Sequence, residues 1–174
     1  MKKQSKLVLV ILLVALSFTL IEIFESEYEE KVEVTSDVVE LFEKLALVTY
    51  VVDGDTIKVD IEGKEETVRY IGIDTPEPYS KSEPECFSKE ASSANRDLVE
   101  GKQVRLVADK EDRDRYGRLL RYIYVDEVFV NAELVRDGFA KVMNIKPNSA
   151  HYEEFLKLEK AAQERSLGMW GVCK

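Results

Sequence analysis

The chain has 174 residues, of which 45% are hydrophobic and 34% are charged. That length accommodates one ordinary domain and a targeting segment, and the composition is typical of a soluble body with a real core. The formal net charge of −9 excludes a protein that holds nucleic acid by bulk positive charge, so any such chemistry must come from a local cluster of cations. Two cysteines and one histidine are too few for a structural zinc site.

The N-terminal segment has the pattern of an export signal. Lys2, Lys3 and Lys6 precede an almost unbroken apolar run over 7–20. A run of that length suits the core of a signal peptide better than a membrane span. We therefore predict that residues 1–21 are a signal peptide, or a signal anchor if they are retained, and that the protein is secreted or held at the cell surface.

The rest of the chain divides into a linker and one domain. Residues 22–46 are predicted to be an acidic linker with one short helix over 37–46. Five β-rich runs then predict strands at 48–52, 56–61, 67–73, 103–108 and 119–125. Helical patterns follow at 88–100 (capped by Ser88), 131–137, and 149–165 with Gly168 as its stop. This order predicts an α+β, mainly β domain over 47–174, a five-stranded OB-fold barrel packed with about three helices.

The two cysteines are predicted to form a disulfide. Cys86 lies just before a predicted helix, and Cys173 is the penultimate residue. Export favours oxidation of such a pair, although two unrelated thiols would fit the same sequence. The bridge would attach the C-terminal tail to the body of the domain.

Two acidic motifs flank the second and third predicted strands. Asp53-Gly54-Asp55-Thr56 could be an ordinary hairpin turn, but a turn needs only one acid. Asp74-Thr75-Pro76-Glu77 could start a helix, but Pro78 and Pro84 argue against one. Pro76 instead favours an extended Thr75, whose carbonyl could face a cation beside Asp74. Two carboxylates and a carbonyl form an oxygen-only set that suits Ca²⁺ and is poor for zinc.

Two arginines add positive charge to the same region. Strand alternation places Arg69 on the face of Ile71 and Ile73, where a charge needs a carboxylate or a phosphate as partner. A structural salt bridge is the other interpretation. Arg118 follows a tight turn in Arg115-Tyr116-Gly117-Arg118 and opens the next predicted strand. Carboxylates that hold a hard cation, together with arginines that hold phosphate oxygens, are typical of a phosphodiester-cleaving site.

Taken together, four motifs resemble the staphylococcal nuclease (thermonuclease) family. They occur in the family's order and spacing over roughly 48–170: Asp-Gly-Asp-Thr, Arg-x₄-Asp-Thr-Pro-Glu, Asp-x-Tyr-Gly-Arg-x-Leu and Asn-x-x-Leu-Val-x-x-Gly-x-Ala-x-Val. The resemblance implies a Ca²⁺-dependent endonuclease that cuts DNA and RNA, prefers single strands and leaves 3′-phosphates. It also implies a monomer that touches a membrane only through an uncleaved N-terminal segment.

The resemblance assigns a role to each matching residue. Asp55 and Asp74 would bind Ca²⁺ through carboxylates and Thr75 through its carbonyl, with Asp53 near the metal. Glu77 would deprotonate or position the attacking water, and Arg69 and Arg118 would stabilise the transition state. Arg115, where the family has lysine, and Tyr116 would bind substrate. The assigned residues are Asp53, Asp55, Arg69, Asp74, Thr75, Glu77, Arg115, Tyr116 and Arg118.

The resemblance is incomplete at one place. Two tyrosines that line the family's nucleotide pocket are missing, and 143–147 reads Met-Asn-Ile-Lys-Pro, one residue shorter. Base stacking would be weaker as a result. Two other hypotheses remain: a non-catalytic OB-fold module that binds nucleic acid, and a surface protein that binds Ca²⁺ for stability.

Overall fold

The computed structural model describes residues 45–78 and 83–173. The predicted signal segment, the linker up to residue 44 and most of the helix predicted over 37–46 lie outside that part. The last two residues of that predicted helix are in a strand instead, because the first strand begins at Leu45.

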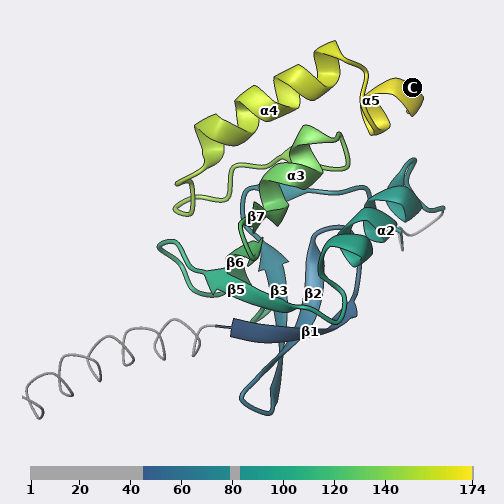
Figure 1. Ribbon diagram of the computed structural model, residues 1–174. Coiled ribbons are helices and arrows are strands. Elements are labelled where there is room, and N and C mark those ends of the chain that lie inside the picture. Colours follow the sequence, from purple (N-terminus) through teal and green to yellow (C-terminus); the bar gives the residue numbers. More distant parts are fainter. Residues whose placement is uncertain (1–44, 79–82, 174) are drawn as a thin grey trace, which may run out of the picture. The chain divides into compact units, whose positions relative to one another are not determined.

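Five strands form a closed barrel (Figure 1). They are β1 (Leu45–Val51), β2 (Thr56–Ile61), β3 (Lys64–Tyr70), β5 (Gln103–Val107) and β6 (Leu119–Val125). Neighbours pair antiparallel in the order β3-β2-β1-β5-β6, and a parallel pairing between β3 and β6 closes the ring. This confirms the predicted α+β fold with a five-stranded OB-type barrel.

A β-bulge in β1 shapes the barrel next to the acidic loop. Val48 pairs with Val59, but Tyr50 pairs with Lys58, so β1 carries one extra residue. Strict alternation would turn either Val48 or Val51 outward, yet both are fully buried. The bulge resolves this conflict and directs the chain from the core into the loop that starts at Val52.

The strand predicted over 67–73 is two strands. β3 ends at Tyr70, and the short β4 (Ile73–Asp74) follows a turn at Gly72, whose φ is 83°. A Cβ at Gly72 would lie 2.8 Å from the Phe155 ring, so the turn also allows a close approach of the last long helix. The prediction that Arg69 shares a strand face with Ile71 and Ile73 was therefore wrong, because β3 ends at Tyr70. Arg69 is nevertheless buried.

Helices cover one end of the barrel. They are α2 (Ser88–Val99), α3 (Val130–Arg136), α4 (Tyr152–Glu164) and the single turn α5 (Met169–Val172). Figure 1 shows α3 between the barrel and α4. Buried Asn131 on α3 donates to the Ile71 carbonyl and accepts from the Ile123 amide, which attaches α3 to β6 and to the turn between β3 and β4. Within the described residues, no helix is long and apolar enough to cross a membrane.

Several predicted boundaries were wrong. Ser88 is the first residue of α2 rather than its cap, and Phe87 holds the capping position in the left-handed region. The last long helix begins at Tyr152 rather than at residue 149 and ends at Glu164, one residue before its predicted end. The sequence did not predict α5, β7 (Val128–Phe129) or β8 (Lys141–Val142), all of which are too short for a periodic pattern.

Candidate active site

Asp55 joins the two acidic motifs at the end of the barrel. Its side chain is almost fully buried, and its Oδ2 accepts hydrogen bonds from the Thr75 amide at 2.8 Å and the Thr75 hydroxyl at 3.0 Å. The Asp53 carboxylate accepts from the Asp55 amide at 3.0 Å, which shapes the turn. No Cβ fits at Gly54, because it would lie 2.7 Å from Thr75 Oγ1. The glycine therefore lets the two motifs touch.

Arg69 bridges the two acids that the sequence assigned to metal binding. Its Nη1 lies 3.1 Å from Asp55 Oδ1, and its Nη2 lies 2.9 Å from Asp74 Oδ1. Nη1 also donates to the Ile73 carbonyl at 2.8 Å. Asp74 is presented by the pairing of β4 with β8, where it lies opposite Lys141. A buried guanidinium with two carboxylate partners is thus held in a fixed orientation.

Burial and mutual repulsion disfavour the charged forms of the acids. Burial raises the pKa of Asp53 to about 6, and the neighbouring Asp55 carboxylate adds to the shift. Burial also raises the pKa of Asp74, against the lowering effect of Arg69. The pKa of Glu77 is raised by partial burial and then by the charges of Asp55 and Asp74. This is an excess of negative charge that a cation would relieve.

A second arginine, Arg118, is positioned by the loop that precedes β6. Asp114 accepts from the Arg118 amide at 3.0 Å and from Arg118 Nε at 2.7 Å. It also accepts from the Tyr116 amide, and hydrogen bonding lowers the pKa of Asp114 against the effect of burial. The Tyr116 ring is 68% exposed, with Arg115 and Arg118 guanidinium carbons at 4.8 and 5.5 Å from its centroid. Asp114 organises this loop, a role that its place in the motif allowed but that sequence reasoning did not assign.

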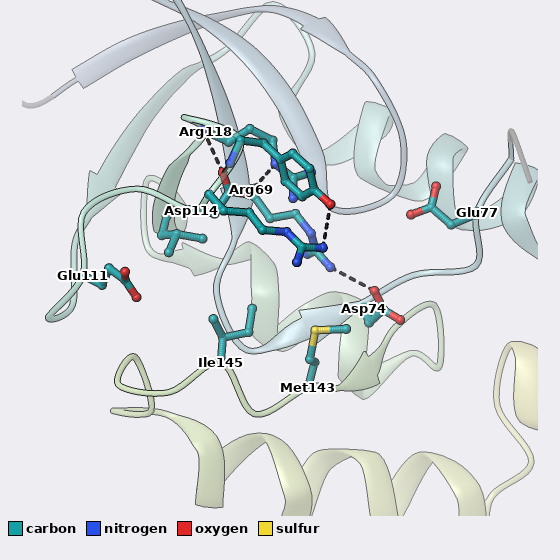
Figure 2. Close-up of a pocket in the computed structure, with 11 residues that line it drawn as sticks. Arg69, Asp74, Glu77, Glu111, Asp114, Arg118, Met143 and Ile145 are labelled. Carbon is teal, nitrogen blue, oxygen red and sulfur yellow. Dashed lines mark hydrogen bonds and ion pairs between the residues drawn. The ribbon is translucent and has the colours of Figure 1, made fainter.

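These side chains surround one pocket of about 540 Å³ (Figure 2). Arg69, Asp74 and Glu77 line it together with the Arg115, Tyr116 and Arg118 loop, while Asp53, Asp55 and Thr75 do not. Figure 2 shows Met143 and Ile145 on the wall across from Arg118. The lining residues are Arg69, Asp74, Glu77, Glu111, Asp114, Arg115, Tyr116, Arg118, Leu120, Met143 and Ile145.

A buried polar network lies behind the acidic loop. Asn95 on α2 is fully buried, and its Nδ2 donates to the Asp53 carbonyl at 2.9 Å. Its Oδ1 accepts from the hydroxyl of Tyr70, also fully buried, at 2.9 Å. Sequence reasoning missed both residues. A polar residue near the middle of an otherwise amphipathic helix was the available signal.

The donor set fits a hard cation. The Asp55 and Asp74 carboxylates and the Thr75 carbonyl offer only oxygen, which suits Ca²⁺ or Mg²⁺ and not zinc. Among the described residues, no three acidic, histidine or cysteine side chains converge as a ready-made metal site.

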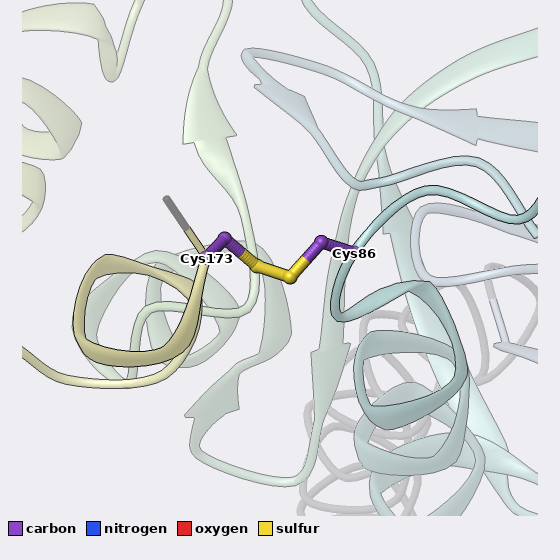
Figure 3. The surroundings of a disulfide bond; sticks show 2 residues. All are labelled: Cys86 and Cys173. Carbon is purple, nitrogen blue, oxygen red and sulfur yellow. A yellow bond between two sulfur atoms is a disulfide. The ribbon is translucent and has the colours of Figure 1, made fainter.

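The predicted cysteine pair is joined in the structure (Figure 3). The disulfide links Cys86, before α2, to Cys173, after α5, with a Cα–Cα distance of 5.9 Å. His151, the only histidine, packs against Tyr122, Phe129 and Phe155 and does not line the pocket.

Comparison with known proteins shows which family the chain is similar to. The family model of staphylococcal nuclease homologues matches residues 67–172. The chain belongs to this family. The match includes Arg69, Asp74, Glu77 and Arg118, and the barrel and pocket agree with it.

Named relatives share one third to almost one half of their aligned residues with this chain. The SPbeta prophage-derived endonuclease YokF of Bacillus subtilis is 44% identical over 124 residues, which are 68% of this chain and 41% of that protein. The thermonuclease of Staphylococcus hyicus is 37% identical over 121 residues, 69% of this chain and 72% of that protein. Endonuclease YncB of B. subtilis is 42% identical over 124 residues, 68% of this chain and 58% of that protein. The aligned part thus spans less than two thirds of the two Bacillus proteins.

Proposed function

We propose that this member of the staphylococcal nuclease family is an endonuclease that hydrolyses phosphodiester bonds of DNA and RNA with Ca²⁺. One observation carries the proposal: two arginines and Glu77 face one pocket beside an acid pair held at the barrel end. The names of the relatives, an endonuclease and a thermonuclease, support it. A non-catalytic binding module would have no need for an acid that can accept a proton at this place.

The acid pair and its loop would hold the metal. Asp55 and Asp74 would bind Ca²⁺ through carboxylates and Thr75 through its carbonyl, and the bound ion would polarise a phosphoryl oxygen. Asp53 shapes the turn next to Asp55 and would not itself bind the ion. Arg69 is the counter-charge that keeps Asp55 and Asp74 at the same place.

Glu77 is the group suited to take a proton. Its raised pKa makes it a stronger base than an ordinary glutamate, and its side chain is exposed to the pocket. A water molecule attacks phosphorus while Glu77 accepts its proton. The bond from phosphorus to the 5′-oxygen breaks, that oxygen leaves with the bonding electron pair and takes a proton from solvent water to become a hydroxyl, and the phosphate stays on the 3′-oxygen. Arg69 and Arg118 donate to the phosphoryl oxygens as their charge increases.

The pocket favours a single strand. Tyr116 offers an exposed ring on which a base can stack, and Arg115 lies over that ring with a charge for a phosphate. Met143 and Ile145 provide apolar contact across the pocket but no second ring. Duplex DNA would have to separate its strands before a base could reach Tyr116.

The N-terminal sequence and the disulfide support export. The chain would act outside the cytoplasm as a monomer, free or attached by its N-terminal segment.

The test is cleavage of end-labelled single-stranded DNA and of RNA by the oxidised full chain, in Ca²⁺ and in chelator. Cleavage that requires Ca²⁺ and leaves 3′-phosphates is expected. Intact nucleic acid that the folded protein nevertheless binds would refute the enzyme and favour the binding module.

A further inference from the structure

The loop that carries Glu77 is held through its backbone. The Glu77 amide donates to Glu85 Oε2 at 3.1 Å, and the Glu85 amide donates back to the Glu77 carbonyl at 3.0 Å. The Glu77 side chain is exposed and lines the pocket. The position of its carboxylate therefore depends on how its backbone is held, and this pair of hydrogen bonds contributes to that.

Glu85 is next to a covalent anchor. Cys86 is bonded to Cys173, whose amide donates to the Met169 carbonyl at 2.9 Å. The Met169 side chain is buried, and its amide donates to the Gly138 carbonyl at 2.9 Å. The anchor thus ends at a buried residue of the domain.

Packing beside this link is incomplete. A second pocket of about 310 Å³ lies between Pro76, which precedes Glu77, and the disulfide. Its walls include Pro76, Glu85, Cys86, Trp170 and Cys173. The pocket is space that side chains do not fill, so packing between the loop and the C-terminal turn is incomplete there. The disulfide joins the two sides of this gap, and the Glu77–Glu85 hydrogen bonds connect it to Glu77.

We propose that Glu85 and the Cys86–Cys173 disulfide form a positioning device for Glu77. This inference rests on the proposed function, since it assumes that Glu77 accepts the proton. Glu85 touches the backbone of Glu77 and no reacting atom, so it acts through Glu77. The device keeps the carboxylate at a productive distance from the attacked phosphorus, where displacement by about 1 Å can cost 10²-fold in rate.

The metal-binding residues are held by other contacts. Asp55 is fixed by Thr75 and Arg69, and Asp74 by Arg69 and by its pairing with Lys141. None of these contacts involves the disulfide. Loss of the device is therefore expected to lower kcat and to leave KM and the affinity for Ca²⁺ unchanged.

Other contacts near Cys86 should keep the protein folded when the disulfide is removed. Phe87 stacks on Phe139 with ring centroids 5.6 Å apart, and Ser88 and Ala91 of α2 are buried. The variant Cys86→Ser with Cys173→Ser is thus expected to fold. Glu85→Ala keeps the disulfide and tests the same device. Glu85→Gln is its matched control, because both remove the charge but only glutamine keeps an oxygen that can accept from the Glu77 amide.

The experiment measures kcat and KM on single-stranded DNA, Ca²⁺ binding by calorimetry, and hydrogen exchange of the Glu77 amide, all on the full chain. Glu85→Ala and the cysteine variant are expected to lower kcat about tenfold, to change KM and Ca²⁺ affinity less than about twofold, and to lose protection of that amide. Glu85→Gln should retain kcat within about twofold of the wild type.

Two results would overturn the device. One is a folded cysteine variant with unchanged kcat and a protected Glu77 amide. The other is an equal loss of kcat and Ca²⁺ affinity, which would show general disruption. If the wild type cleaves nothing in Ca²⁺, the proposed function fails, and amide exchange still decides whether the disulfide and Glu85 hold Glu77.

Discussion

Replacing Asn95 with alanine should destabilise the protein far more than its position on α2 suggests. The amide of Asn95 connects polar groups of two buried residues: the Asp53 carbonyl and the Tyr70 hydroxyl. Alanine leaves both without that partner. A buried group left unpaired costs about 1–3 kcal/mol, so the loss of unfolding free energy should be about 2–5 kcal/mol.

A variant of Tyr70 provides the control. Tyr70→Phe removes the hydroxyl and leaves only Asn95 Oδ1 unpaired, at a cost of about 1–2 kcal/mol. In the double variant the hydroxyl is absent, so the combined loss should be smaller than the sum of the single losses by about 1 kcal/mol. That difference isolates the Tyr70–Asn95 contact from the contact to Asp53.

The assay is urea unfolding of the oxidised protein in chelator, which removes any stabilisation by bound Ca²⁺. Equal m-values would show that the compared states are the same. A loss below about 0.5 kcal/mol for Asn95→Ala, or strict additivity in the double variant, would refute the view that this network holds the acidic loop.

Three further outcomes can be checked on the same protein. Gly138→Ala should cost at least about 1 kcal/mol more than Gly63→Ala in urea unfolding: both glycines have positive φ, but only at Gly138 would a Cβ lie 2.3 Å from the Leu167 carbonyl oxygen. Equal costs would contradict this. Arg118→Lys should lower kcat on single-stranded DNA about 10²-fold. Arginine donates to Asp114 through Nε and still offers other nitrogens to phosphate, whereas lysine has one nitrogen only. A loss under threefold would argue against this role of Arg118. Ca²⁺ at 100 times its Kd should raise the unfolding free energy by about 2.7 kcal/mol in calorimetry, and an unchanged melting temperature would count against the metal site.

The sequence predicts the barrel well because its strands follow local rules. Ile57 and Val59 alternate with polar neighbours, and Gly63 marks the turn between β2 and β3. The motif residues Arg69, Asp74 and Glu77 also line one pocket as expected, since they are close in the chain, on β3, on β4 and in the loop after it.

What the sequence does not predict depends on contacts between distant segments. The break at Gly72 follows from the approach of Phe155, 83 residues later in the chain. Asn95 looks like a solvent-facing helix residue until α2 packs behind the Asp53 loop. Glu85 carries no motif, and its relation to Glu77 appears only when both loop ends are placed. Such residues have at most a weak local signal, because their partners come from distant segments of the chain.

Single-turnover cleavage of single-stranded DNA by Glu77→Gln decides whether this pocket is a hydrolytic site. Glutamine keeps the size of the side chain but cannot accept the proton. The rate in Ca²⁺ should fall by about 10²–10⁴-fold, while Ca²⁺ affinity and DNA binding stay within about threefold of the wild type. A variant that cleaves at the wild-type rate would show that Glu77 is not the base, and the mechanism derived from this pocket would be wrong.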